Sequence, residues 1–104
     1  MNQTPAVPTR PLNTGRTIPL LGLGTAGMTD DEAAVAVRGA LRMGYRLVDT
    51  ASRYGNETGV GRGIRDSGVP REEIVVTTKL RGADHGYDTV RTALHASLDR
   101  LGLE

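Results

Sequence analysis

Short apolar runs alternate with amphipathic segments three times along this chain, and that alternation leaves few folds open. Strands are expected at residues 18–23, 46–49 and 74–79, and helices at about 30–43, 56–66 and 88–101. Strands that alternate with helices in this way form a parallel sheet with right-handed crossovers. Two α/β architectures fit, a doubly wound sheet or part of a (β/α)8 barrel. A barrel needs eight such units and about 250 residues, and this chain of 104 residues supplies three.

The segment ahead of the first unit carries a turn signal, Asn13-Thr14-Gly15-Arg16, which predicts a leading β-hairpin. Residues 1–11 are expected to form a flexible leader, and residues 12–104 a partial barrel domain. At the start of the first helix, Thr29 and Glu32 have the spacing of a capping box. The third helix is expected to turn one apolar stripe inward: Val90, Leu94, Leu98 and Leu101.

Composition narrows the choice of partners and location. The net charge is +1, which gives no reason to expect a nucleic-acid or membrane-surface partner. No apolar run is long enough to span a membrane or to form a signal peptide, so a cytoplasmic protein is expected. The chain has no cysteine and two isolated histidines, and we therefore predict no metal site.

Three chemically active side chains follow the ends of neighbouring strands. Asp49 ends the strand at 46–49, Tyr54 comes five residues later, and Lys79 ends the strand at 74–79. A carboxylate at the mouth of a sheet requires a cation, and Lys79 is the obvious candidate. Of the 13 basic residues, Lys79 alone is a lysine. A purely structural ion pair is one interpretation, since removing one partner of a buried pair costs about 3–5 kcal/mol.

Tyr54 suggests a chemical interpretation of the same pair. A free phenol is a poor proton donor near neutral pH, because its pKa is about 10. A cation about 4 Å away, at an effective dielectric constant of ~20, contributes about 4 kcal/mol toward releasing the proton. With Asp49 holding Lys79 beside it, Tyr54 could act as a general acid. The alternative is a loop tyrosine that packs over the mouth of the sheet.

The glycines after the first strand suggest a different class of site. Gly22, Gly24 and Gly27 match the dinucleotide fingerprint G-x-G-x-x-G, and Asp49 lies 22 residues beyond the last of them. That fingerprint places a pyrophosphate on the first turn of the following helix. Here the turn holds Asp30, Asp31 and Glu32, which would repel phosphate. A Rossmann-type binding domain therefore remains an alternative, and a tight strand-to-helix turn is the simpler explanation.

The run 44–61 resembles the first signature of the aldo-keto reductases, through Gly44, Tyr45, Arg46, Asp49, Ala51, Glu57 and Gly61. Thr77-Thr78-Lys79-Leu80 resembles the third-strand segment of that family. Residues 86–104 resemble bacterial members that act on small carbonyl compounds. The resemblance covers about residues 12–104 and implies the first three β-α units of a (β/α)8 barrel.

The resemblance also implies a reaction, in which NADPH reduces an aldehyde or ketone to an alcohol. It makes Tyr54 the proton donor, Lys79 the residue that makes its hydroxyl more acidic, and Asp49 the partner of Lys79. Gly24, Thr25, Ala26 and Asp49 match positions that line the nicotinamide end, although NADH is not excluded. Family members carry a catalytic histidine after the fourth strand, and neither His85 nor His95 matches it. We therefore expect a truncated chain.

A chain of three parallel strands leaves open sheet edges, which can pair with another polypeptide. This gives a further alternative, a non-catalytic interaction module. Such a module would associate with itself or supply one part of a split barrel.

Overall fold

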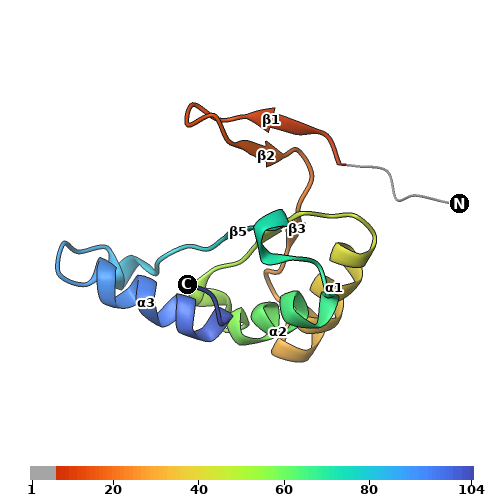
Figure 1. Cartoon of the computed structure of the whole chain (residues 1–104). Helices are drawn as coiled ribbons and strands as arrows, with labels where there is room; N and C mark the ends of the chain where they lie inside the picture. Colours follow the sequence, from red (N-terminus) through yellow and green to blue (C-terminus); the bar gives the residue numbers. More distant parts are fainter. Residues whose placement is uncertain (1–6) are drawn as a thin grey trace, which may run out of the picture.

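The computed structural model describes residues 7–104, and the leader predicted at residues 1–11 falls partly outside this range. The elements are β1 (Thr9–Pro11), β2 (Thr17–Pro19), β3 (Leu23–Gly24), α1 (Asp30–Arg42), β4 (Leu47–Asp49), α2 (Glu57–Ser67), β5 (Val75–Thr77) and α3 (Val90–Leu101). β1 and β2 form an antiparallel hairpin, and β3, β4 and β5 form a parallel sheet in that order. Figure 1 shows the hairpin on one side of this sheet and the helices on the other. The three predicted β-α units and the leading hairpin are confirmed.

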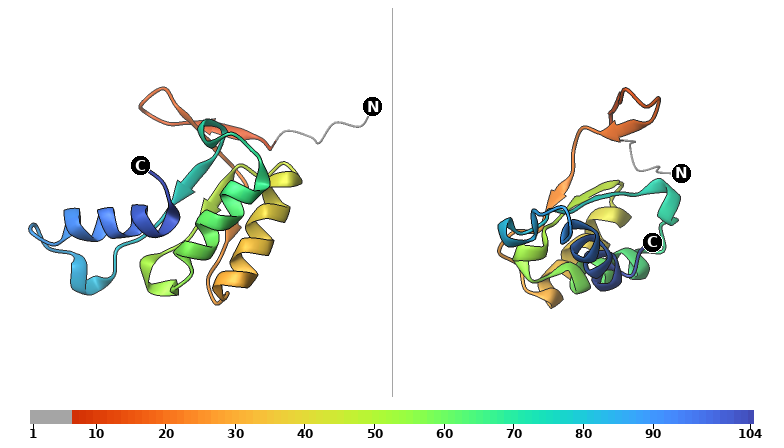
Figure 2. Two further views of the ribbon diagram at one scale, coloured as in Figure 1. Left: turned by 60° about the horizontal axis from the view of Figure 1, so that its bottom comes forward. Right: turned by 90° about the vertical axis from the view of Figure 1, so that its left-hand side faces the viewer.

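The core lies between the parallel sheet and the helices. Val48 at the centre of β4 is fully buried, as are Val37 of α1 and Val60 of α2. Ile64 and Leu101 join the same cluster from α2 and α3. The views in Figure 2 show α1 and α2 side by side, with α3 beyond α2. Burial of this apolar face is therefore what fixes the helices on the sheet.

Glycines let α2 approach both neighbouring helices closely. A Cβ atom at Gly63 would lie 2.7 Å from the Ala34 carbonyl oxygen of α1, and one at Gly59 would overlap the backbone of Asp30. On the opposite side, a Cβ at Gly61 would overlap the Leu101 carbonyl of α3. Because these glycines have no side chain, the backbone of α2 can contact the backbone of α1 on one side and that of α3 on the other.

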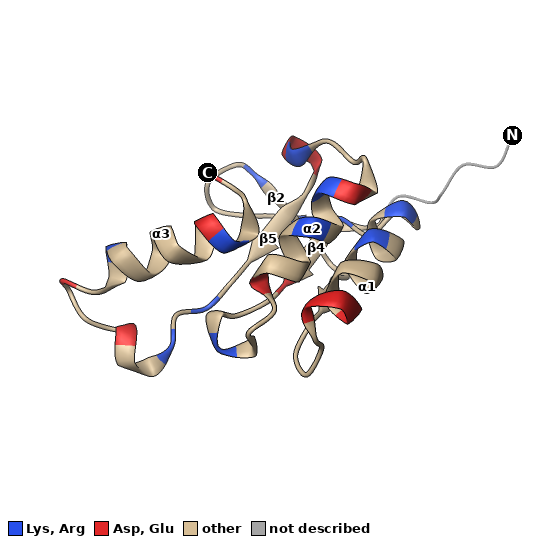
Figure 3. Cartoon of the chain, turned by 90° about the horizontal axis from the view of Figure 1, so that it is seen from below, with Lys and Arg blue, Asp and Glu red and all other residues tan. Residues whose placement is uncertain are grey.

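The helix starts are stabilised in two different ways. The predicted capping box of α1 is confirmed: Glu32 N donates to Thr29 Oγ1 at 3.2 Å, and Thr29 N donates to the Glu32 carboxylate at 3.0 Å. Asn56 occupies the N-cap position of α2 but makes no capping bond. Instead, Gly59 N donates to Asp30 Oδ1 at 2.8 Å. The acidic first turn of α1, red in Figure 3, therefore caps the neighbouring helix as well as its own.

The first predicted strand, 18–23, is wrong as a single element. Its beginning belongs to β2, where Pro19 pairs with Thr9 of the hairpin, and its end belongs to β3. Proline has no N–H to continue a ladder, and the chain changes sheets after it. The hairpin also uses Thr9–Pro11, which lie within the predicted leader at residues 1–11.

The apolar stripe predicted for α3 turns inward only in part. Leu101 is buried and Leu98 is half-buried, where the end of α3 meets α2. Val90 and Leu94 are exposed, because no other side chain within residues 7–104 covers these two. No helix in this described range is long and apolar enough to cross a membrane.

Candidate active site

Strand register gathers the candidate residues at one end of the parallel sheet. Gly24 of β3 pairs with Asp49 of β4, and Asp49 pairs with Thr77 of β5. Residues in register on neighbouring strands project to the same face, so this row shares one side of the sheet. The Thr77 hydroxyl donates to Asp49 Oδ1 at 2.5 Å. One oxygen of the Asp49 carboxylate is thereby fixed from β5.

Lys79 holds the other oxygen of that carboxylate. Its Nζ donates to Asp49 Oδ2 at 2.6 Å and to the Thr50 carbonyl at 3.0 Å. The prediction of an Asp49–Lys79 pair is confirmed, but its burial is not: the two side chains are 41% and 52% exposed, because this end of the sheet is open to solvent. An ion pair this exposed contributes only about 0–1 kcal/mol to folding. Its effect is chiefly on local geometry and charge.

The pair keeps both members charged. Partial burial tends to raise the pKa of Asp49, but the hydrogen bonds from Lys79 and Thr77 outweigh it and lower the pKa of that carboxyl. The hydrogen bond to Asp49 raises the pKa of Lys79 against a smaller opposing effect of burial, and Tyr54 acts in the same direction. Lys79 is therefore a fixed cation through the neutral range.

Tyr54 lies next to that cation. It ends the short 3₁₀ turn η1 (Ser52–Tyr54), which Gly55 closes at a φ of 70°. Lys79 Nζ lies 5.4 Å from the centroid of the Tyr54 ring, within range of a cation–π contact. Ser52 attaches the turn to the segment just after β5, because its N–H and its hydroxyl both donate to the Lys79 carbonyl at 3.1 Å. The structure thus brings Asp49, Tyr54 and Lys79 together, as the sequence predicts.

The residues expected at the nicotinamide end, Gly24, Thr25 and Ala26, have different surroundings. A Cβ at Gly24 would meet no atom within 4 Å, so the space beside Asp49 is open. Ala26 is exposed. Thr25 is fully buried, and both its N–H and its hydroxyl donate to the Asp49 carbonyl, at 3.2 and 3.0 Å. Gly24 and Ala26 therefore leave room for a flat ring, whereas the Thr25 side chain anchors β3 to β4.

Asn56 is a buried connection that sequence reasoning missed. Its Nδ2 donates to the carbonyls of Thr25 at 2.7 Å and Met28 at 3.1 Å, and its Oδ1 accepts from the Thr50 hydroxyl at 2.9 Å. The sequence predicts Asn56 only as the start of a helix, because asparagine is a common N-cap. The helix cap supplied by Asp30 leaves its side chain for this role. Asn56 thereby connects the turn after Tyr54 to the loop at residues 25–28.

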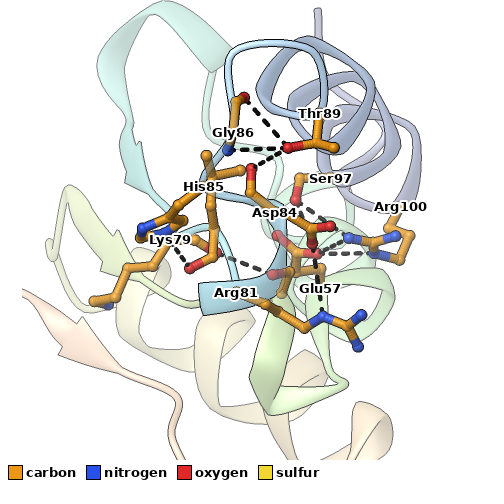
Figure 4. Close-up of polar contacts among 11 residues, drawn as sticks. Glu57, Lys79, Arg81, Asp84, His85, Gly86, Thr89, Ser97 and Arg100 are labelled. Atoms are coloured by element: carbon orange, nitrogen blue, oxygen red, sulfur yellow. Dashed lines mark hydrogen bonds and ion pairs between the residues drawn. The ribbon is translucent and has the colours of Figure 1, made fainter.

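Glu57 is a second buried group whose contacts the sequence did not reveal. Its side chain is 0% exposed, and its Oε2 accepts from the Thr78 hydroxyl at 2.7 Å. Its Oε1 accepts from Ser97 Oγ at 3.2 Å and from Arg100 Nε at 2.8 Å. Figure 4 shows Ser97 and Arg100 converging on Glu57 from α3. Glu57 is one of the positions at which the run 44–61 resembles the family signature, but that resemblance does not name its hydrogen-bond partners.

The arrangement described so far agrees with comparisons to known proteins. The model of the Aldo/keto reductase family matches residues 20–104, most of the chain. The chain belongs to the aldo/keto reductase family. An aldo-keto reductase of Mycobacterium marinum is 54% identical over 101 residues, which are 97% of this chain and 36% of that protein. The chain thus spans about a third of the length of the curated relatives it matches.

Solved aldo-keto reductases share the fold. The enzyme from Brucella melitensis matches with a TM-score of 0.89 and 49% identity, over 93% of this chain and 38% of that one. The Bombyx mori enzyme, solved in complex with NADP, also has a TM-score of 0.89, with 44% identity over 94% of this chain and 35% of that one. The elements of the chain are therefore part of a (β/α)8 barrel. This corrects the Rossmann alternative: Gly22, Gly24 and Gly27 belong to a strand-to-helix turn of the barrel.

Among residues 7–104, no three histidine, cysteine or acidic side chains gather where they could hold a metal ion.

Proposed function

We propose that this chain is the N-terminal, catalytic portion of a reductase that converts an aldehyde or ketone to an alcohol with NADPH. The observation that carries the proposal is the cluster of Asp49, Lys79 and Tyr54 at the carboxyl ends of adjacent parallel strands. Active sites of (β/α)8 barrels are found at this end. A structural ion pair would need neither the nearby tyrosine nor the open space at Gly24.

The open space beside Asp49 fits a nicotinamide ring. Gly24, Ala26 and Asp49 would border the ring, and Thr25 would act from behind by holding the Asp49 backbone. When bound, the reduced nicotinamide supplies a hydride to the carbonyl carbon. The NADP complex of the Bombyx mori relative supports the phosphorylated cofactor, with NADH as the second choice.

Three side chains of this chain would supply the proton that the carbonyl oxygen needs. The Tyr54 hydroxyl donates a proton to the carbonyl oxygen as that oxygen gains negative charge. The Lys79 cation beside the ring stabilises the phenolate that remains. Asp49 accepts a hydrogen bond from Lys79 and keeps the ammonium group in place. Solvent access at this end of the sheet allows Tyr54 to be reprotonated.

Transfer of deuterium from the cofactor tests the proposal. An enzyme of the relatives' length that carries this segment is supplied with NADPH deuterated at the transferable position and with a panel of small aldehydes and ketones. We expect an alcohol with one deuterium on the former carbonyl carbon, detected by mass spectrometry, because the hydride moves directly between the bound molecules. Oxidation of the cofactor without deuterium in the product, or no oxidation with any carbonyl compound, would contradict a reductase.

A second candidate is an interaction module that pairs with the polypeptide supplying further β-α units. Two features favour it: β3 and β5 each pair on one side only within residues 7–104, and Val90 and Leu94 of α3 are exposed. Open strand edges and apolar helix faces favour association. The 104-residue chain should therefore form oligomers, or a complex with the added polypeptide, by light scattering. A stable monomer that does not bind the added polypeptide would argue against this candidate.

A further inference from the structure

The end of β5 is attached to the protein by contacts that the sheet does not provide. The last residue paired with β4 is Thr77, and Thr78 and Lys79 lie beyond it. The Lys79 carbonyl accepts from Ser52, and its ammonium group contacts Asp49 and Thr50. The remaining attachment is the Thr78 hydroxyl, which donates to Glu57 Oε2 at 2.7 Å.

Glu57 is a rigid acceptor for that hydroxyl. It is the first residue of α2, its carboxylate is fully buried, and Arg100 pairs with it at 2.7 Å. Arg100 is 42% exposed and, with Glu57, lines a pocket of about 580 Å³ between α2, α3 and the loop after β5. The positive charge of Arg100, which is partly exposed to solvent, thus compensates the buried negative charge of Glu57. The carboxylate is held by α3 through Oε1 and holds β5 through Oε2.

We propose that Glu57 is a positioning residue for Lys79, acting through Thr78. The bond from Thr78 fixes the direction of the chain as it leaves β5, and so fixes the point from which the Lys79 side chain reaches back to Asp49 and Tyr54. In Figure 4, Lys79 points away from Glu57, so the acid acts on the lysine through the backbone and not by direct charge contact. The idea that Lys79 must be positioned for a reaction rests on the proposed function.

The two oxygens of Glu57 allow this role to be separated from a purely structural one. Thr78→Val removes the hydroxyl bound to Oε2 and keeps the shape of the side chain. Ser97→Ala removes a hydroxyl bound to Oε1 on the α3 side and leaves the bond from Thr78 to Oε2 in place. Both variants take one hydrogen bond from the same buried carboxylate. Only the first removes an attachment of the β5 end.

The reactivity of the single lysine provides the measurement. The 104-residue chain is treated at mildly alkaline pH with a trace of acetic anhydride, and mass spectrometry gives the acetylation of Lys79 relative to the α-amino group. An amine reacts as its free base, and the hydrogen bond to Asp49 raises the pKa of Lys79, so weakening that bond raises the fraction of Lys79 that reacts. We expect Thr78→Val to raise the ratio about threefold or more, because a loosened Lys79 spends less time bonded to Asp49. Thr78→Ser should restore the original ratio, and Ser97→Ala should leave it unchanged.

The result that overturns the proposal is equally direct. An unchanged ratio in Thr78→Val, or an equal rise in Ser97→Ala, would mean that Glu57 serves stability alone. If Thr78→Val does not fold by circular dichroism, Thr78→Ala removes the same hydroxyl without a branched methyl group and is read in the same way. The labelling ratio needs no turnover, so its failure is distinct from a failure of the deuterium transfer.

Discussion

Replacing Tyr54 with phenylalanine should remove most of the turnover of an enzyme of the relatives' length that carries this segment, and leave its affinity for NADPH nearly intact. Phenylalanine keeps the ring that faces the Lys79 ammonium group, 5.4 Å from its centroid, and removes only the hydroxyl. A positioned general acid contributes about 10²- to 10⁴-fold to a rate. The steady-state kcat should fall within that range, while calorimetric titration with NADPH gives an almost unchanged Kd.

Tyr87 provides the matched control for that substitution. It is 97% exposed in the loop before α3, so Tyr87→Phe removes a hydroxyl from the same chain without touching the site. Its kcat should equal that of the unaltered enzyme. Unchanged turnover in Tyr54→Phe would remove the proton donor from the proposed mechanism. A matching loss in both variants would point to a general effect of the change.

Gly61→Ala should destabilise the chain by about 3 kcal/mol, near the upper end of the cost of forcing extra volume into a packed site. The new methyl group would overlap the Leu101 carbonyl, which is part of the helix backbone and cannot rotate away. That carbonyl also accepts from Arg65 at 3.2 Å, and Leu101 itself is buried in the core. Relief therefore requires α3 to move away from α2. Urea unfolding followed by circular dichroism measures the loss.

Gly39→Ala is the matched control for Gly61→Ala, because it makes the same change at a helix position that has no close neighbour. It lies within α1, and a Cβ there would meet no atom within 4 Å. Gly39→Ala should stabilise the chain by about 0.5–1 kcal/mol, because alanine loses less conformational entropy in a helix. Similar unfolding midpoints for the two variants would show that α2 and α3 are not in backbone contact.

The sequence was sufficient for features that depend on periodicity and strand direction. Alternating strands and helices predict the parallel sheet, and the carboxyl ends of its strands meet at one edge, so Asp49 and Lys79 could be expected to pair. The capping box at Thr29 and Glu32 could also be recognised, because its two hydrogen bonds span only three residues. Each of these signals is local, or follows from a general rule of sheet topology.

Features that depend on distant partners could not be predicted in the same way. Glu57 is bonded to Thr78, Ser97 and Arg100, and no spacing pattern in the sequence connects these positions. The exposure of Val90 and Leu94 also escaped prediction, because a helical stripe shows which residues share a face and not whether anything covers it. The division of residues 18–23 between β2 and β3 also escaped prediction. It depends on the pairing of β2 with β1, and β1 contains no apolar run that would mark it as a strand.

The hydrogen bond from Gly59 to Asp30 makes the first two β-α units dependent on each other. The amide that α2 would otherwise leave free at its start is satisfied only while the first turn of α1 is wound. Hydrogen exchange at Gly59 should therefore report the opening of the first turn of α1 as well as that of α2. These two units would then unfold locally as one cooperative block, although Asp30 and Gly59 lie 29 residues apart in the chain.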